Sequence, residues 1–89
     1  SEKKYGRAMR SLGWVYFNKN DFEKAAECFT FATQVNYYNP NTWFTLGCCY
    51  IRMEKFEKAL RPFGESVRMI KHKVKHGEIL PLAICNLKK

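Results

Sequence analysis

The sequence predicts an all-α fold of two antiparallel helix–turn–helix hairpins, and three observations lead to that prediction. The chain of 89 residues contains an internal repeat, apolar residues recur at helical spacing within each repeat, and turn-forming residues separate the helical segments. Shifting the chain by thirty-four positions aligns eight identical residues without a gap. These residues are Leu12, Gly13, Tyr16, Phe22, Glu23, Lys24, Ala25 and Phe29, which align with Leu46, Gly47, Tyr50, Phe56, Glu57, Lys58, Ala59 and Phe63.

The first repeat, residues 6–39, reads as two helices separated by Lys19-Asn20-Asp21. Asp21 is a plausible N-cap for the second helix, because its carboxylate can accept a hydrogen bond from a free backbone N–H. In the first helix, steps of three and four place one apolar set on one face: Met9, Leu12, Gly13, Tyr16 and Phe17. In the second helix, the set expected to face inward is Phe22, Ala25, Ala26, Phe29, Ala32 and Val35.

The second repeat, residues 40–73, follows a turn over residues 36–39. Asn39 before Pro40 suits a cap followed by proline at the first helical position. The inward face of the first helix is expected to hold Trp43, Leu46, Gly47, Tyr50 and Ile51, and that of the second helix Phe56, Ala59, Leu60, Phe63 and Val67. Pro62 lies well past the first turn of that second helix, so we expect a kinked or frayed helix that ends near Met69.

Glycine stands at the same place in both repeats, Gly13 and Gly47. Glycine inside a helix costs up to about 1 kcal/mol relative to alanine, so its recurrence needs a packing reason. Close approach of the two helices of each hairpin supplies that reason, since the distance between packed helices depends on the side chains at the crossing.

The spacing Trp43-x-x-Leu46-Gly47-x-x-Tyr50, followed by Ala59 and Phe63, resembles the signature of the tetratricopeptide repeat family. The resemblance covers roughly residues 6–71, with Met9 in place of the first tryptophan and Ser66 in place of a small alanine. It implies a short right-handed solenoid with a C-terminal capping helix, and a non-enzymatic interaction module without cofactor. Within this family, three segments resemble the tetratricopeptide repeat protein 27 family: Arg7-Ala8-x-Arg10-Ser11, Glu27-Cys28-Phe29 and Trp43-Phe44-x-Leu46-Gly47-Cys48.

The composition limits which partners and which cellular setting can be expected. The net charge of +8 favours acidic partners or nucleic acid. No stretch approaches the roughly 20 apolar residues of a membrane span, and the first residues do not form a signal peptide. The four cysteines are therefore expected to be reduced, in a cytoplasmic or nuclear protein. The chain is expected to form one domain, as a monomer or a weak homodimer.

Metal binding and catalysis are both disfavoured. His72 and His76 are four residues apart, as in helical metal sites, but lysines surround them and no Cys-x-x-Cys motif completes a tetrahedral site. No histidine or carboxylate stands at a recognisable spacing from Cys28, Cys48, Cys49 or Cys85 to activate a thiol.

The candidate site is a concave groove, because in tetratricopeptide arrays the first helix of each hairpin lines the concave face. Arginine offers a bidentate fork for carboxylates, while tryptophan and phenylalanine offer apolar contact area. These residues would suit a peptide or partner protein with acidic and apolar groups, although the aromatics could instead pack against neighbouring repeats. The positions carried over from the family are Arg7, Arg10, Trp14, Phe17 and Asn18 in the first repeat and Asn41, Phe44, Cys48, Ile51 and Arg52 in the second.

Two alternatives remain open. The basic residues of 68–76 could bind RNA phosphates without sequence preference, although this segment lacks interleaved aromatic residues for base stacking. The domain could instead be architectural, stacking on neighbouring repeats or on another copy, with Phe31, Tyr37 and Tyr38 as the residues to watch. Residues 78–88 could cap the array or begin a third repeat.

Overall fold

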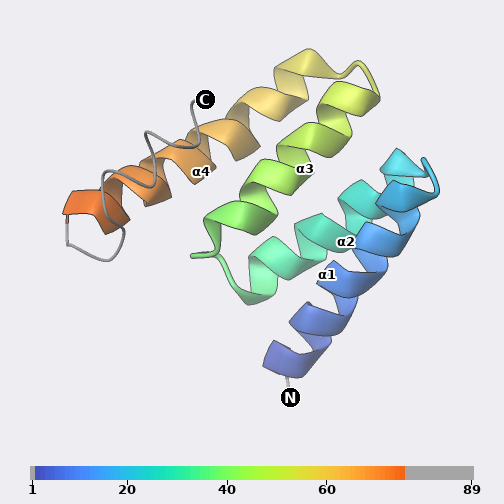
Figure 1. The fold of residues 1–89 in the computed structure, drawn as a ribbon, viewed down its shortest axis with the longest axis horizontal. Coiled ribbons are helices and arrows are strands. Elements are labelled where there is room, and N and C mark those ends of the chain that lie inside the picture. The colour runs from blue at the N-terminus through green and yellow to red at the C-terminus, as the bar shows by residue number, and fades with distance from the viewer. Residues whose placement is uncertain (1, 76–89) are drawn as a thin grey trace.

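The computed structural model describes residues 2–75, and it confirms the all-α fold of two stacked hairpins. Its four helices are α1 (Glu2–Asn18), α2 (Phe22–Val35), α3 (Pro40–Arg52) and α4 (Phe56–Lys75), and the described residues contain no strand. α1 and α2 form the first hairpin, α3 and α4 form the second, and α2 packs on α3 where the hairpins meet (Figure 1). Each end helix therefore has one main neighbour, whereas α2 and α3 have two. The predicted capping segment 78–88 lies outside the described residues.

The predicted helix starts are confirmed. The Asp21 carboxylate accepts a hydrogen bond of 3.3 Å from the backbone N–H of Lys24 at the start of α2. The Asn39 side chain accepts one of 3.1 Å from the backbone N–H of Asn41, and Pro40 opens α3. Both side chains satisfy donors that have no partner within the helix, which fixes where each helix begins.

The turns inside the two hairpins have the same backbone but different residues. Asn20 and Glu54, which are equivalent in the repeat, both adopt a left-handed conformation, with φ of 64° and 60°. The next residue in each turn donates its backbone N–H to the equivalent tyrosine carbonyl, Asp21 to Tyr16 at 2.9 Å and Lys55 to Tyr50 at 2.8 Å. The duplication therefore extends to the turns. Asparagine tolerates the left-handed region better than glutamate does.

The repeated glycines lie at close helix–helix contacts, as the sequence analysis predicted. A Cβ on Gly13 would stand 3.0 Å from the ring of Phe29 in α2. A Cβ on Gly47 would stand 2.7 Å from the ring of Phe63 in α4. Each glycine thus leaves room for the large aromatic ring of the partner helix. Gly64, which is not conserved between the repeats, faces open space.

The core forms where the hairpins meet. Its buried members come from α2, α3 and α4, and Tyr16, Phe17, Tyr50 and Met53 pack against it. The buried indole N–H of Trp43 has a partner, because Nε1–H donates a hydrogen bond of 2.6 Å to the carbonyl oxygen of Tyr37. This bond connects the first turn of α3 to the loop before it. The buried cluster consists of Ala25, Ala26, Phe29, Trp43, Leu46, Cys49 and Met69.

Several residues predicted to face inward are exposed, and that part of the prediction is wrong. On α4 these are Phe56, Leu60 and Val67, and on α3 the residue is Ile51. Leu12, predicted to lie on the apolar face of α1, is exposed as well. The helical periodicity places residues on a face correctly, but a face is buried only where another helix covers it. The described residues provide no such helix for the outer side of α4.

The predicted fraying at Pro62 is also wrong, as is the predicted helix end near Met69. α4 continues without interruption through Pro62 to Lys75. Pro62 is buried together with Ala59, Ser66 and Met69, on the side of α4 that packs on α3. Ser66 also donates its hydroxyl to the carbonyl of Pro40, at 3.0 Å in a buried position. This packing offsets the backbone hydrogen bond that a proline removes.

Candidate functional site

The ten predicted groove residues lie on the first helices of the two hairpins. Five lie on α1 and five on α3, and most have exposed side chains. Arg10, Phe17 and Cys48 are half-buried. The structure thus places the residues on α1 and α3, two helices that both pack on α2, but it does not make all of them surface groups.

A cavity of about 300 Å³ adjoins the first part of α1, and it is the clearest hollow among the predicted positions. Arg7 and Arg10 line it on α1, and the end of α2 and the start of α3 supply the other walls. The cavity is therefore lined by two arginines and two asparagines, of which Asn39 also caps α3. Guanidinium groups form paired hydrogen bonds with carboxylates. The lining residues are Gly6, Arg7, Arg10, Ala32, Val35, Asn36, Asn39 and Thr42.

Two exposed aromatic side chains of the predicted set are held by rings beneath them. Trp14 packs edge-on against Phe17 and Phe29, with ring centroids 5.4 and 5.6 Å apart. Phe44 packs at a tilt against Phe63 at 5.4 Å. Both side chains are substantially exposed, but the neighbouring rings already restrict their motion. Binding of a partner would therefore order them at little entropic cost.

Phe17, Cys48 and Arg52 have structural surroundings of their own. Phe17 contacts the ring of Phe22 at 5.1 Å, and the Arg52 guanidinium stands 5.6 Å from the centre of that same ring. Arg52 therefore joins the end of α3 to the start of α2 through a cation–π contact. Of these residues, Arg52 makes a contact between the two hairpins, while Phe17 packs within the first hairpin and Cys48 is half-buried.

The described cysteines are free, and burial makes them poor nucleophiles. Burial raises the pKa of the Cys28 and Cys48 thiols, and it raises that of Cys49 to about 12. Since the thiolate is the reactive form, all three favour the inert thiol at neutral pH. Within residues 2–75, no three His, Cys, Asp or Glu side chains gather closely enough to hold a metal ion. His76, the second member of the predicted histidine pair, lies outside the described residues.

The sequence analysis missed a second hollow surface, which lies between α2 and α4 and has residues of α3 in its lining. Two cavities of about 460 and 410 Å³ share four lining residues there, so they form one continuous depression. On α2 the lining includes Ala26 and Thr30 together with the longer side chains of Glu23, Glu27 and Gln34. No local sequence signal indicated it, because the depression depends on how α2, α3 and α4 pack together. The shared residues are Thr30, Gln34, Tyr50 and Lys58.

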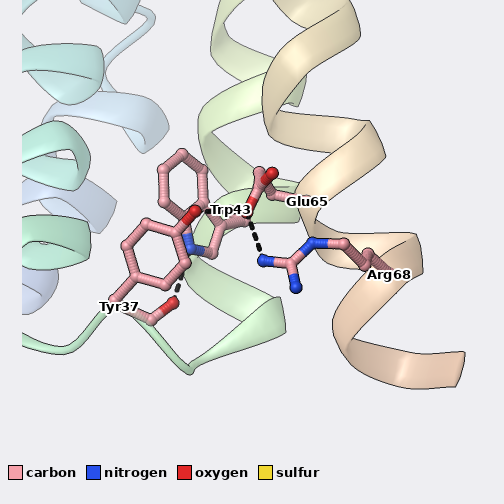
Figure 2. Close-up of polar contacts among 4 residues, drawn as sticks. All are labelled: Tyr37, Trp43, Glu65 and Arg68. Atoms are coloured by element: carbon pink, nitrogen blue, oxygen red, sulfur yellow. Dashed lines mark hydrogen bonds and ion pairs between the residues drawn. The ribbon is translucent and has the colours of Figure 1, made fainter. Parts of the chain in front are cut away.

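A polar cluster that the sequence analysis also missed ties the loop before α3 to α4 (Figure 2). Tyr37 donates its hydroxyl to Glu65, and Arg68 donates to the same carboxylate oxygen at 2.8 Å. The Tyr37 ring also packs edge-on against Trp43 at 5.1 Å. The bond to Arg68, and secondly that to Tyr37, lowers the pKa of Glu65, while the bond to Glu65 raises the pKa of Tyr37. Both the hydroxyl and the ring of Tyr37 are thus engaged in contacts within the chain.

Comparison with known proteins identifies the repeat. Residues 6–39 and 40–69 each match the family model described as a tetratricopeptide repeat. The chain belongs to the tetratricopeptide repeat family. Such repeats generally mediate protein–protein interaction, and proteins built from them are typically non-enzymatic scaffolds. No solved structure matches the chain significantly. Among residues 2–75, no helix combines the length and apolarity that a membrane crossing requires.

Two curated proteins are similar to this tetratricopeptide repeat chain. The first is the TPR repeat-containing protein C19B12.01 of Schizosaccharomyces pombe, 36% identical over 62 residues, which are 70% of this chain and 8% of that protein. The second is the tetratricopeptide repeat protein 27 homolog of Dictyostelium discoideum, 38% identical over 55 residues, which are 62% of this chain and 6% of that protein. The narrower resemblance to the tetratricopeptide repeat protein 27 family is therefore supported. The chain spans less than a tenth of the length of either relative.

Proposed function

We propose that this chain binds a partner protein or peptide through the surface formed by α1 and α3, and that an acidic segment of the partner enters the cavity beside Arg7 and Arg10. The observation that carries the proposal is this cavity, which Arg7 and Arg10 line. Arg7, Arg10 and Trp14 follow one another at steps of three and four on α1, so they share one helical face.

The chemistry of that face defines the partner. Two guanidinium groups line one cavity, and carboxylates are the side chains that they pair with most strongly. Trp14 lies further along α1 and offers apolar contact, as interface tryptophans commonly do. A peptide with acidic residues followed by an apolar residue would therefore contact both parts. The net charge of +8 would accelerate its approach at low salt.

The test is affinity capture from cell extract with a charge-reversed variant, Arg7→Glu and Arg10→Glu. A matched control, Lys71→Glu and Lys75→Glu, changes the net charge equally but alters only α4. Proteins retained by the native chain and the control, but lost from the α1 variant, would support the proposal and identify the partner. Equal retention by all three proteins would contradict it.

One structural observation favours a second candidate function, nonspecific RNA binding. The sequence of 68–76 lacks aromatic residues, but the exposed ring of Tyr38 lies beside Arg68, His72 and Lys73 around a cavity of about 320 Å³. A base could stack on Tyr38 while lysines contact phosphates. If this function holds, binding of a single-stranded homopolymer RNA should weaken steeply with salt, and Tyr38→Ala should reduce it.

A further inference from the structure

Among the described residues, four polar side chains are buried, and one of them differs from the others in its hydrogen bonding. The hydroxyls of Thr33, Thr45 and Ser66 donate to backbone carbonyl oxygens at 2.6, 2.9 and 3.0 Å. Thr42 is only 3% exposed, yet its hydroxyl has no hydrogen-bond partner within residues 2–75. Buried polar groups normally have a partner, because desolvation without one costs free energy.

The Thr42 hydroxyl opens into the cavity that Arg7 and Arg10 line. In the described part of the chain, no side-chain oxygen or nitrogen that is sealed from solvent lacks a partner. The unpartnered oxygen of Thr42 must therefore be reachable from outside. Since Thr42 lines this cavity of about 300 Å³, its hydroxyl is a donor on the cavity wall that a ligand can reach.

Thr42 offers a second donor, its backbone N–H, in the first turn of α3. The N–H groups of a first helical turn have no partner inside the helix. Pro40 has no N–H, and the Asn39 side chain accepts the N–H of Asn41. The Asn39 carbonyl oxygen accepts the N–H of Trp43 at 3.4 Å, whereas no described residue accepts that of Thr42. A helix N-terminus with unused donors is an arrangement that binds anions.

The two arginines of the cavity are unpaired as well. Neither the Arg7 nor the Arg10 guanidinium has a hydrogen bond or an ion pair with any described residue, and the cavity lining contains no Asp or Glu. The last turn of α2 also lines the cavity, and its negative end would oppose an anion. A helix end carries only about half a charge, and the positive end of α3 offsets it. The two full charges of the arginines therefore decide that the cavity favours an anion.

We propose that this anion is a phosphorylated serine or threonine side chain of the partner protein, with its phosphate between the two guanidinium groups and Thr42. The inference rests on the proposed function, because it names the group that enters the same cavity. A phosphoserine carries a charge of about −2 and three acceptor oxygens, whereas a carboxylate carries one charge and two oxygens.

The arrangement of the donors supports a phosphate over a carboxylate. Thr42 is buried, Arg10 is half-buried and Arg7 is exposed, so the donors lie at different depths of one cavity. A phosphate presents oxygens in three directions and can use all of these donors at once, and its charge equals that of the two arginines. A nucleic-acid phosphate is a diester with one charge and a chain on both sides, so it matches this cavity less well.

Thr42→Val separates binding from folding. The change replaces the hydroxyl by a methyl group and retains both the branched shape and the backbone N–H. Because the hydroxyl has no partner in the folded chain, Tm should stay the same or rise slightly. Thr45→Val is the matched control, since it removes a hydroxyl bonded to the Asn41 carbonyl at 2.9 Å. That control should lower Tm and leave phosphopeptide binding unchanged in the folded protein, and Thr42→Ser should retain binding.

The experiment uses the immobilised 89-residue chain and three peptide libraries with the same random flanks and a fixed central phosphoserine, glutamate or serine. Mass spectrometry identifies retained peptides, and fluorescence anisotropy then measures the affinity of the best of them. We expect phosphoserine peptides to bind at least tenfold more tightly than their glutamate counterparts. Thr42→Val should weaken this binding roughly tenfold, and Arg7→Gln with Arg10→Gln should weaken it further. Lys71→Glu with Lys75→Glu controls for net charge and should retain it.

The outcomes separate this inference from the proposed function. Equal retention of phosphoserine and glutamate peptides, lost in the arginine variant, would overturn the phosphate inference and leave the proposed function in place. Retention of no library, or retention that the arginine variant does not reduce, would overturn the inference, and capture from cell extract then decides the proposed function separately. Competition by inorganic phosphate or by homopolymer RNA at the affinity of the peptides would also overturn it, because the occupant would then be a free anion or a nucleic acid.

Discussion

The two hairpins share one plan but differ in how fully their second helices are covered. α2 packs against α1 on one side and α3 on the other, whereas α4 packs mainly on α3 among the described helices. The equivalent aromatic residues show the result, since Phe29 is fully buried and Phe63 is half-buried. The same motif therefore contributes differently to stability according to its neighbours, as nearest-neighbour models of repeat proteins expect.

The hairpin turns differ in a second way that burial does not explain. The first turn uses Asn20 and Asp21, which suit a left-handed residue followed by an N-cap. The second turn places Glu54 and Lys55 in the same two positions, and neither residue is favoured there. The second hairpin thus has the poorer turn chemistry, while each hairpin has one end helix with a single main neighbour. We therefore expect its turn, rather than its coverage, to weaken the second hairpin.

The largest effect should come from truncating the equivalent aromatic residues. Phe29→Ala removes a fully buried ring and should destabilise the chain by about 3–5 kcal/mol. Phe63→Ala should cost clearly less, since its ring is half-buried. Urea unfolding of both variants measures the difference. Equal losses would contradict the view that the first hairpin holds the better-packed ring.

A smaller effect is expected when a methyl group is added at the helix contacts. Gly47→Ala places a Cβ 2.7 Å from the Phe63 ring and should cost about 1–3 kcal/mol through overpacking. Gly64→Ala is the matched control in α4, because it meets nothing within 4 Å. It should stabilise the helix by about 0.5–1 kcal/mol. Thermal unfolding distinguishes the two signs, and destabilisation by both changes would refute the packing role of Gly47.

The turn comparison predicts a stabilising double variant. Glu54→Asn with Lys55→Asp copies the first turn into the second, and it should add about 1–2 kcal/mol by relieving the left-handed glutamate and providing an N-cap for α4. In the first turn, Asp21→Ala should remove the capping hydrogen bond of α2 and destabilise the chain by a similar or smaller amount. Chemical denaturation checks both, and no gain from the double variant would contradict the comparison.

The smallest effect concerns the polar cluster on the second hairpin. Glu65 has a lowered pKa, so its contribution is present at neutral pH and is lost as the pH falls below the ordinary glutamate range of about 4. Tyr37 has a raised pKa, so its contribution is present below the ordinary tyrosine range of about 10 and is lost as the pH rises through the raised value. Tyr37→Phe should lower Tm by at most a few degrees at neutral pH, because the groups are exposed.

Melting curves of native, Tyr37→Phe and Tyr38→Phe proteins across acid and neutral pH make that measurement. The difference between native and Tyr37→Phe should shrink as the solution becomes acidic. Tyr38→Phe, which removes a hydroxyl from the adjacent ring, should match native throughout. A difference for Tyr37→Phe that persists unchanged in acid would mean that Glu65 is not its partner in solution.

Much of the fold could be predicted from the sequence because local signals and the repeat agreed. Asp21, Asn39 and Pro40 marked helix starts, and Gly13 and Gly47 marked helix contacts. Two features could not be predicted, since both depend on which helix covers which. Periodicity placed Leu60 on an apolar face but could not show that no other described helix covers this face, and the proline rule could not show that packing keeps α4 intact at Pro62.

The candidate site was predictable only in part, and for the same reason. The family layout placed Arg7, Arg10 and Trp14 on the first helix, and the cavity beside the arginines is a result of packing. Spacing alone could not indicate that Phe17 and Cys48 are half-buried or that Arg52 stands over the Phe22 ring. The hollow between α2 and α4 needed the positions of three helices together.

The two tryptophans lie in such different surroundings that each gives its own optical signal. Trp43 is only 7% exposed and its indole N–H is bonded to the Tyr37 carbonyl, whereas Trp14 is 45% exposed on the α1 surface. A dissolved quencher such as iodide should reach Trp14 and leave Trp43 protected until the chain unfolds. Protection of Trp14 would then report occupation of the α1 surface, and loss of protection at Trp43 would report opening of the core. The unlabelled protein can thus serve as its own fluorescent probe for both events.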